Sequence, residues 1–246
     1  PSGHPGIAVC RPPVPDRPEL ACLTIAHRAG NNLHALESAL AAGADAIECD
    51  FWHARGRLEL RHERKIPALP IVFDKWYVRW QWGELSLRRL LREINFRAEL
   101  FLDIKSGSPR AADAVLDLYH DHAAMMPRTR VSSPQWRLLD RIADAGTKME
   151  MYYSIGHAGA IPRLIARAGA SPRPAGTSIR HSLLSPEVIA RLHGAGLRVF
   201  AWTVNHADRA EQLIDWGVDG IISDEAEILS LTRSNATAGS GAPPSP

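Results

Sequence analysis

Residues 21–51 read ACLTIAHRAGNNLHALESALAAGADAIECDF, with two short apolar runs on either side of one helical pattern. The apolar runs at residues 21–27 and 45–51 have the length of buried strands. Between them, residues 33–42 are rich in Ala and Leu, and Gly43 stands where a helix C-cap is expected. This stretch therefore predicts a strand, a helix and a second strand.

The same alternation continues along the rest of the chain. Further strands are expected at residues 99–105, 130–133, 148–155, 177–182, 198–204 and 220–223, with an extra hairpin to residues 58–62. Helices are expected at residues 86–94, 110–122, 185–195, 207–216 and 225–231. Two more are expected, one that begins after Pro134 and one that follows the strand at residues 148–155 and ends at Ala168. Strict alternation over eight β–α units favours a (β/α)8 TIM barrel, a single domain with a short insertion after the second strand. A doubly wound open sheet is the alternative, but no Gly-x-Gly-x-x-Gly follows the first strand.

The amino-acid composition predicts the limits of the domain and argues against some classes of partner. The 246 residues carry a net charge of only +2, which indicates no general attraction to nucleic acid. Ends rich in proline, glycine and serine predict a flexible segment at residues 1–18 and a disordered tail at residues 234–246, with the barrel at residues 19–233. No apolar run approaches the length of a membrane span, and no obligate protein partner is inferred.

Cysteine usage favours a reducing compartment. The three cysteines are Cys10, Cys22 and Cys49, and an odd number argues against a disulfide framework, although a Cys10–Cys22 bridge stays open. We therefore expect a cytoplasmic location. Because the chain begins with Pro1 rather than Met, a secreted or periplasmic location also stays open.

The ends of the predicted strands carry the candidate functional residues, because the active site of a TIM barrel forms at the carboxyl ends of its strands. The acidic residues on the second and third strands, and the histidines and cationic residues near them, are the side chains of interest. These candidates are His27, Arg28, Glu48, Asp50, His62, Asp103, Lys105 and Trp202.

Strand parity predicts that the acidic side chains converge. Successive side chains on a strand face opposite sides, so Glu48 and Asp50 share the inward face and Cys49 faces the helices. The same parity turns Asp103 and Lys105 inward on the adjacent strand. Three carboxylates this close cannot all remain ionised unaided, and a divalent cation with oxygen ligands, Mg²⁺ or Ca²⁺, resolves the repulsion.

Histidines and cations beside such a site indicate phosphate-ester cleavage. His27 and His62 can transfer protons near neutral pH, and Arg28 and Lys105 supply positive charge for an anionic group. His181, on the sixth predicted strand, is an outside candidate for the same pocket. Asn205 is interpreted as the N-cap of the seventh helix, with Asp208 at its third position.

Motifs near both ends of the predicted barrel resemble those of glycerophosphodiester phosphodiesterases. The first is IAHRAG at residues 25–30 followed by ALAAGADAIECD at residues 39–50, and the strand LDIK at residues 102–105 matches a further family feature. The last is VFAWTVN at residues 199–205 with GVDGIISD at residues 217–224. This similarity covers most of residues 23–231 and implies a metal-dependent phosphodiesterase on a (β/α)8 barrel.

The resemblance also implies roles for individual residues. It implies that Glu48, Asp50 and Asp103 hold the divalent metal and that His27 and His62 form the acid–base pair. It further implies that Arg28 and Lys105 bind phosphate and that Trp202 lines the substrate pocket. The chain departs from the family at four places. Ala29 follows His-Arg in place of the usual Gly, and the Pro-Glu-Asn-Thr helix start is shortened to Asn31-Asn32. Asp103 stands where Glu is common, and the insertion at residues 52–84 is brief.

Two alternatives to glycerophosphodiester hydrolysis stay open. The Asp-x-Lys third strand and short first loop are similar to those of sphingomyelinase D-like phospholipases, which implies lysophospholipase D-like cleavage of a lipid phosphodiester. The aromatic segment at residues 71–82 is interpreted either as a lid on the barrel mouth or as a peripheral membrane contact. A catalytically inactive, phosphate-binding barrel is the second alternative.

Overall fold

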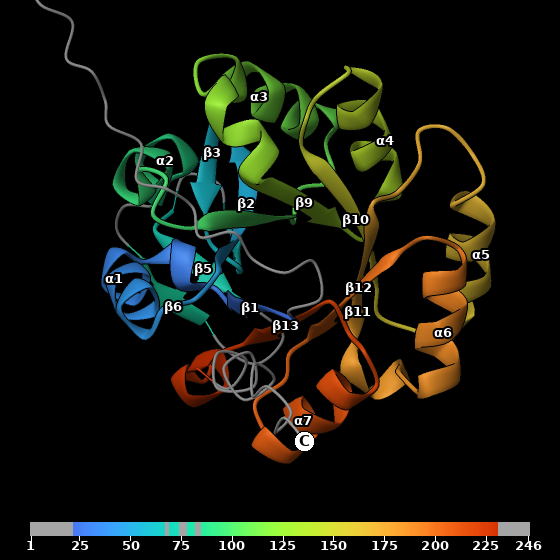
Figure 1. Ribbon diagram of the computed structural model, residues 1–246. Helices are drawn as coiled ribbons and strands as arrows, with labels where there is room; N and C mark the ends of the chain where they lie inside the picture. Colours follow the sequence, from blue (N-terminus) through green and yellow to red (C-terminus); the bar gives the residue numbers. More distant parts are fainter. Residues whose placement is uncertain (1–21, 67–68, 74–77, 82–84, 231–246) are drawn as a thin grey trace, which may run out of the picture.

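The chain forms a closed barrel of parallel strands (Figure 1). The computed structural model describes residues 22–66, 69–73, 78–81 and 85–230. Within these residues, β1 pairs with both β13 and β2, which closes the sheet. The barrel strands are β1 Leu23–Ala26, β2 Ala46–Ala54, β8 Glu99–Ile104, β9 Thr129–Ser133, β10 Glu150–Ile155, β11 Gly176–Arg180, β12 Arg198–Trp202 and β13 Gly220–Ser223. The predicted (β/α)8 TIM barrel is confirmed.

Helices surround the barrel on its outside (Figure 1). They are α1 Leu33–Ala42, α2 Leu87–Ile94, α3 Pro109–His120, α4 Trp136–Asp144, α5 Ile161–Arg167, α6 Pro186–Gly194 and α7 Ala207–Asp215, and residues 226–230 are also helical. Asn32 and Ser185 accept backbone N–H groups at the starts of α1 and α6, and Gly43 ends α1 at a φ of 80°. Every helix in the described part of the chain is too short or too polar to cross a lipid bilayer.

The strand register places the predicted faces as expected. Asp50 on β2 lies directly beside Asp103 on β8. Cys49 and Leu102, which alternate with them, are fully buried in the hydrophobic layer between strands and helices. A second, smaller cluster fills the barrel interior and contains Ile25, Ala46, Phe101, Tyr152, Phe200 and Ile222. The acidic side chains therefore stand above a packed apolar floor.

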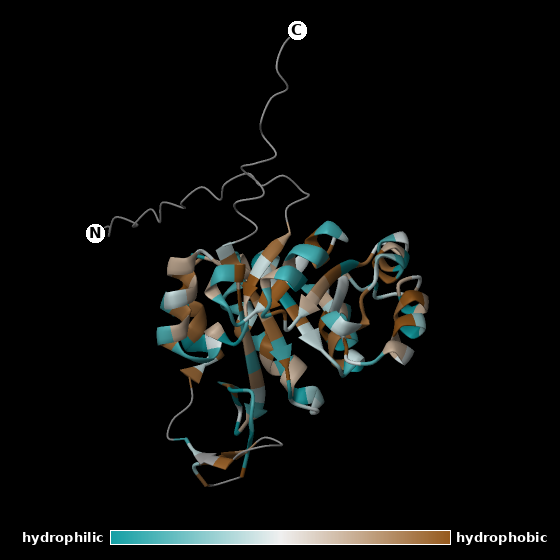
Figure 2. Cartoon of the chain, turned by 90° about the horizontal axis from the view of Figure 1, so that it is seen from below, coloured by the Kyte–Doolittle hydropathy of each residue, from teal (hydrophilic) through white to brown (hydrophobic). Residues whose placement is uncertain are grey.

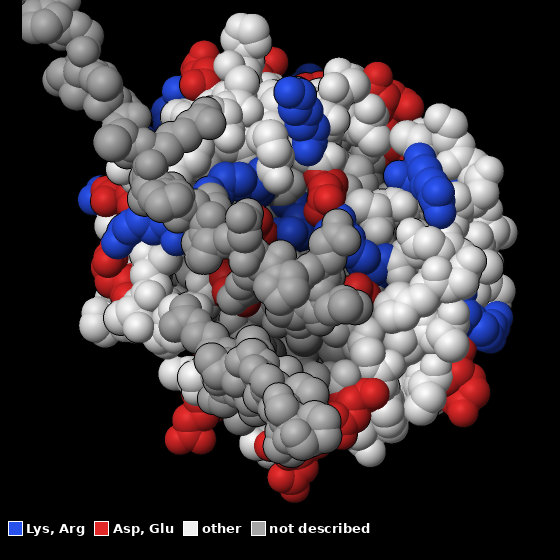
Figure 3. Space-filling model, viewed as in Figure 1, with Lys and Arg blue, Asp and Glu red and all other residues white. Residues whose placement is uncertain are grey.

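Charged residues lie at the amino-terminal ends of the strands. Arg130 pairs with Glu99 and, at 3.3 Å, with Glu150, and Glu150 also pairs with Arg198. Figure 3 shows side chains of opposite charge next to one another over the middle of the barrel. These pairs join β8, β9, β10 and β12 at the end of the barrel opposite to the predicted site.

The insertion after β2 begins as a hairpin and continues as a separate small sheet. β3 Arg57–Leu60 pairs antiparallel with β2, and β7 Leu85–Ser86 pairs with β3. The small sheet contains β4 Arg64–Lys65, β5 Ile71–Phe73 and β6 Val78–Trp80, and it projects from one end of the barrel (Figure 2).

Two local predictions are wrong. β11 ends at Arg180, and His181 begins a short 3₁₀ helix at His181–Leu183, because the Arg209 guanidinium binds the His181 ring and carbonyl. The N-cap of α7 is His206 rather than Asn205, whose side chain binds residues after β13 instead. The segment at residues 1–18 and the tail at residues 234–246, for which flexibility and disorder are predicted, lie outside the described residues, as do Cys10 and residues 74–77 and 82 of the aromatic segment.

Phe200→Ala should destabilise the fold strongly, because the Phe200 ring stacks on Tyr152 at 4.5 Å between ring centroids and contacts Phe101 at 5.7 Å. Removing a buried aromatic ring costs about 3–5 kcal/mol of unfolding free energy, measurable by urea denaturation. Val78→Ala, at a side chain that is 71% exposed, is the control and should change it by less than about 0.5 kcal/mol. Equal effects of the two substitutions would contradict the assignment of this cluster as a core.

Candidate active site

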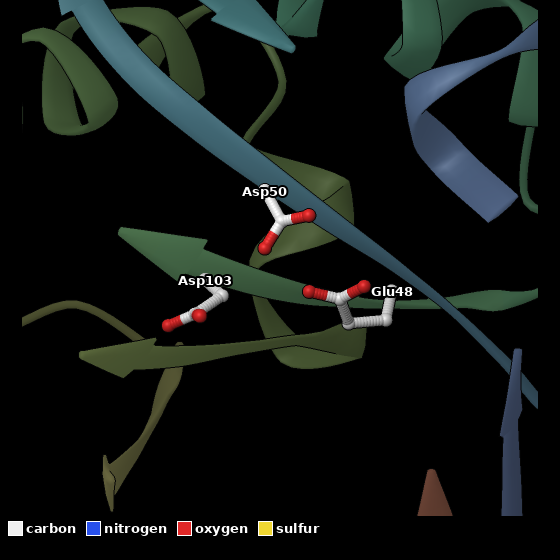
Figure 4. Close-up of side chains that lie close together, drawn as sticks. All are labelled: Glu48, Asp50 and Asp103. Atoms are coloured by element: carbon white, nitrogen blue, oxygen red, sulfur yellow. The ribbon is translucent and has the colours of Figure 1, made fainter. Parts of the chain in front are cut away.

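Three carboxylates from two adjacent strands converge at the carboxyl end of the barrel. Glu48 and Asp50 project from β2 and Asp103 from β8 (Figure 4). One oxygen of each lies within 4.8 Å of the others. Glu48 is 3% exposed and Asp50 is 1% exposed, so solvent screens their repulsion poorly.

Burial and mutual repulsion shift the pKa values of the carboxylates in this cluster. Burial, reinforced by the charges of Asp50 and Asp103, raises the pKa of Glu48 well above its usual value. Burial alone would also raise the pKa of Asp50, but Lys105, His62 and Arg28 outweigh it and lower that pKa.

Lys105 supplies positive charge between two of the carboxylates. Its Nζ contacts Asp103 and lies 3.0 Å from Asp50 Oδ1. Burial alone would lower the pKa of Lys105, but Asp103, Asp50 and Glu48 together raise it. The lysine is therefore held charged, and one ammonium group faces three acidic side chains.

The donor set fits a hard divalent cation. Asp103 Oδ1 is buried and accepts no hydrogen bond from the described residues, and among these residues only Lys105 contacts Asp50 Oδ1. Buried carboxylate oxygens without donors are costly unless they bind a cation. An all-oxygen set of this kind suits Mg²⁺ or Ca²⁺ rather than a metal that prefers sulfur or imidazole.

The loop after β1 fixes the carboxylates from the opposite side. Arg28 takes a left-handed conformation with φ 55°, and its backbone N–H donates to Glu48 Oε2 at 2.6 Å. The Asn31 amide binds Asp50 twice, donating to Oδ2 at 2.9 Å and accepting from the backbone N–H at 3.0 Å. Gly30 is needed here because an added Cβ would lie 2.7 Å from the Cβ of Cys49. The sequence pattern does not predict this role of Asn31, because it depends on a contact with Asp50, 19 positions away.

His27 has a carboxylate partner that sequence reasoning also missed. Its Nδ1 lies 2.7 Å from Oδ1 of Asp224, directly after β13. The hydrogen bond from His27 is the main reason that the pKa of Asp224 falls to about 2. Asn205 holds Asp224 in turn, donating to Oδ2 at 2.8 Å and accepting its backbone N–H at 3.0 Å. The signal was available, since Asp224 is a polar residue at a strand end within a quoted family motif.

All of the predicted site residues line one cavity of about 280 Å³. They are His27, Arg28, Glu48, Asp50, His62, Asp103, Lys105 and Trp202. Phe101 and Ile222 contribute to the wall from the barrel interior, and Ser154 and Ser178 from the strand ends. His181 is not among the lining residues and binds Arg209 instead. The cavity combines acidic groups that fit a cation, two cationic side chains and two imidazoles.

Added Mg²⁺ or Ca²⁺ should stabilise the protein against thermal unfolding, because a cation relieves the repulsion among the three carboxylates. At a hundredfold excess over the dissociation constant the gain is about 2.7 kcal/mol. Asp103→Asn should weaken cation binding by at least about tenfold in calorimetric titrations. Asp113→Asn is a matched control, since that carboxylate pairs with Arg141 on the surface. Identical cation binding in both variants would rule out this site.

The comparisons with known proteins point to one family. The model of the Glycerophosphoryl diester phosphodiesterase family matches residues 109–228. Probable glycerophosphodiester phosphodiesterase 2 of Mycobacterium tuberculosis (strain ATCC 25618 / H37Rv) is 43% identical over 47 residues, which cover 19% of this chain and 18% of that protein. A Bacillus subtilis protein named for the same activity, YhdW, is 38% identical over 52 residues, 21% of each chain. The chain thus aligns with about a fifth of each of these curated relatives.

Solved structures match over nearly the whole barrel. A glycerophosphodiester phosphodiesterase from Parabacteroides distasonis matches with a TM-score of 0.70 and 20% identity, covering 89% of this chain and 100% of that one. An Oleispira antarctica phosphodiesterase in complex with the product sn-glycerol-3-phosphate matches with a TM-score of 0.70 and 17% identity, covering 87% of this chain and 97% of that one. At these identities the likeness shows a shared fold. Together with the sequence matches, it confirms the resemblance of this chain to the glycerophosphodiester phosphodiesterase family.

Proposed function

We propose that the protein is a metal-dependent phosphodiesterase that hydrolyses glycerophosphodiesters to sn-glycerol 3-phosphate and an alcohol. The observation that carries this proposal is the single cavity lined by three acids, two histidines and two cationic side chains. A structural neighbour that binds sn-glycerol-3-phosphate as its product supports the substrate class. A barrel that only binds phosphate would not require this complete set.

In this proposal the acidic residues bind the metal ion and the cationic residues bind the phosphate group. Glu48, Asp50 and Asp103 would hold Mg²⁺ or Ca²⁺, which neutralises charge on the phosphoryl oxygens when bound. Arg28 and Lys105 contribute further positive charge for the same oxygens. Trp202 forms the apolar wall on the side of β12.

The two histidines move the protons. A glycerol hydroxyl next to the ester attacks phosphorus, the bond to the alcohol breaks, and a cyclic phosphate forms. His27 accepts the hydroxyl proton at Nε2, since its Nδ1 is committed to Asp224, and His62 gives a proton to the departing alcohol oxygen. Water then opens the cyclic phosphate with the histidines in reversed roles, which restores both. Asp224 acts as a positioning residue that fixes the ring and tautomer of His27.

Glycerophosphodiesters should be hydrolysed only in the presence of a divalent cation. We expect release of sn-glycerol 3-phosphate from glycerophosphoglycerol and glycerophosphoethanolamine, loss of activity with excess chelator, and recovery on addition of Mg²⁺ or Ca²⁺. A coupled assay for sn-glycerol 3-phosphate measures all three. Activity that survives exhaustive chelation would refute the role of the metal, and inactivity on every phosphodiester would favour the non-catalytic alternative.

Cleavage of lipid phosphodiesters is the second candidate function. Val78 and Trp80 of β6 are 71% and 66% exposed, so the insertion offers apolar side chains that could rest on a lipid surface. Lysophosphatidylcholine belongs in the same assay for this reason. Turnover of the long-chain substrate alone would replace glycerophosphodiester hydrolysis by a lysophospholipase D-like activity with peripheral membrane contact.

His27→Ala and His62→Ala should each lower kcat by at least about 100-fold, because each removes a proton-transfer group. His120→Ala, at the exposed end of α3, is the control and should leave kcat unchanged. Near-normal turnover in both active-site variants would refute the acid–base assignment. Circular dichroism of each variant separates loss of catalysis from loss of fold.

A further inference from the structure

A second cavity of about 490 Å³ adjoins the first one. The two cavities share Arg28 and His62 in their walls. The second cavity lies between the loop after β1 and the insertion after β2. The charged and polar side chains in its lining that bear on a ligand are those of Arg28, Asn32, Arg61, His62, Glu63 and Gln81.

The second cavity lies where one of the two alcohol halves of a phosphodiester substrate would extend from the phosphate. Displacement at phosphorus places the attacking and leaving oxygens roughly in line on opposite sides of the phosphorus atom. The two halves of the substrate therefore extend in opposite directions from the phosphate. A phosphate bound over the carboxylates would leave one half of the substrate in the first cavity, and the other half would reach the second cavity past His62. His62 is the residue assigned to protonate the departing alcohol.

The polar groups of the second cavity include several with unused hydrogen-bonding capacity. Asn32 accepts two backbone N–H groups through Oδ1, which leaves its amide NH₂ available as a donor. The Arg28 side chain is 42% exposed and offers further donors. Gln81 Oε1 is enclosed and accepts no hydrogen bond from the described residues, so a donor from a ligand would relieve it. By contrast, Asn31 and Arg61 are committed to neighbouring protein groups.

The second cavity is poorly suited to a quaternary ammonium group. Such groups are bound by cages of aromatic rings. Among the described lining residues, His62 is the only one with an aromatic ring, and the two guanidinium groups of Arg28 and Arg61 outnumber the one carboxylate, that of Glu63. Hydroxyl groups, which both donate and accept hydrogen bonds, match the amide and guanidinium groups that remain.

We propose that this second cavity binds the alcohol half of the substrate and selects a neutral polyol, such as a glycerol or inositol head group, over choline. The inference rests on the proposed function, because it assigns a substrate class to the same site.

Specificity constants for three substrates test the proposal. Glycerophosphoglycerol presents a polyol, glycerophosphocholine presents a quaternary ammonium, and the methyl ester of sn-glycerol 3-phosphate presents almost no head group. We expect the polyol ester to have the highest kcat/KM of the three. In Gln81→Leu, the ratio of kcat/KM for the polyol ester to that for the methyl ester should fall about tenfold, the effect of one lost hydrogen bond of ~1.4 kcal/mol. Gln212→Leu on α7 is the matched control and should preserve the ratio.

The outcomes separate this inference from the proposed function. Hydrolysis of the methyl ester with preference for choline, or an unchanged ratio in Gln81→Leu, would overturn the polyol site and leave the phosphodiesterase intact. A loss in Gln81→Leu that is equal for both esters would also overturn it, because the head group would not be involved. Failure of the unaltered protein to hydrolyse any of the three esters with metal present would overturn the proposed function itself.

Discussion

The repulsion among three acidic side chains in a poorly solvated barrel mouth is the constraint on which the site depends. Glu48 and Asp50 are almost fully buried, and Asp103 stands beside them. Lys105 offsets part of this charge, and the loop after β1 contributes N–H donors from Arg28 and Asn31. These contacts hold the oxygens close together without satisfying all of them. The protein thus gathers carboxylate oxygens whose repulsion is only partly offset, an arrangement suited to binding a divalent cation.

Barrel closure makes this arrangement stable. In an open sheet β1 would be an edge strand, but here it pairs with β13 on one side and β2 on the other. This pairing brings Asp224 to His27 and places the loop after β1 over Glu48. The apolar interior beneath, centred on Phe101, Tyr152 and Phe200, forms a rigid floor. The packing of the barrel core therefore offsets the free-energy cost of holding the acidic side chains close together.

The sequence predicts local features well and long-range contacts poorly. Two-residue periodicity is enough to turn Glu48, Asp50 and Asp103 toward one another, because the side chains on a strand alternate and parallel neighbours stay in register. The bond between His27 and Asp224 joins residues 197 positions apart, and no periodicity records it. Asn205 is a second example of a long-range contact that the sequence does not predict. A short polar residue before a helix is typical of an N-cap, but the Asn205 side chain binds Asp224 after β13 instead. His181 was misassigned because strand length is weakly specified where an apolar run meets a polar turn.

The β2–β3 hairpin joins the cavity of the proposed chemistry to the proposed head-group cavity. β2 continues past its last pairing with β8, and β3 returns so that the backbone N–H of Arg61 donates to the Asp50 carbonyl at 3.0 Å. This return places His62 beside the carboxylates and makes it part of the wall between the two cavities. Among the described residues of the insertion beyond it, Glu63, Gln81 and Leu85 line the outer cavity and are absent from the wall of the first one. Under the proposed function, changes in the insertion would alter the preferred head group, while the carboxylates, carried by β2 and β8, would keep their geometry.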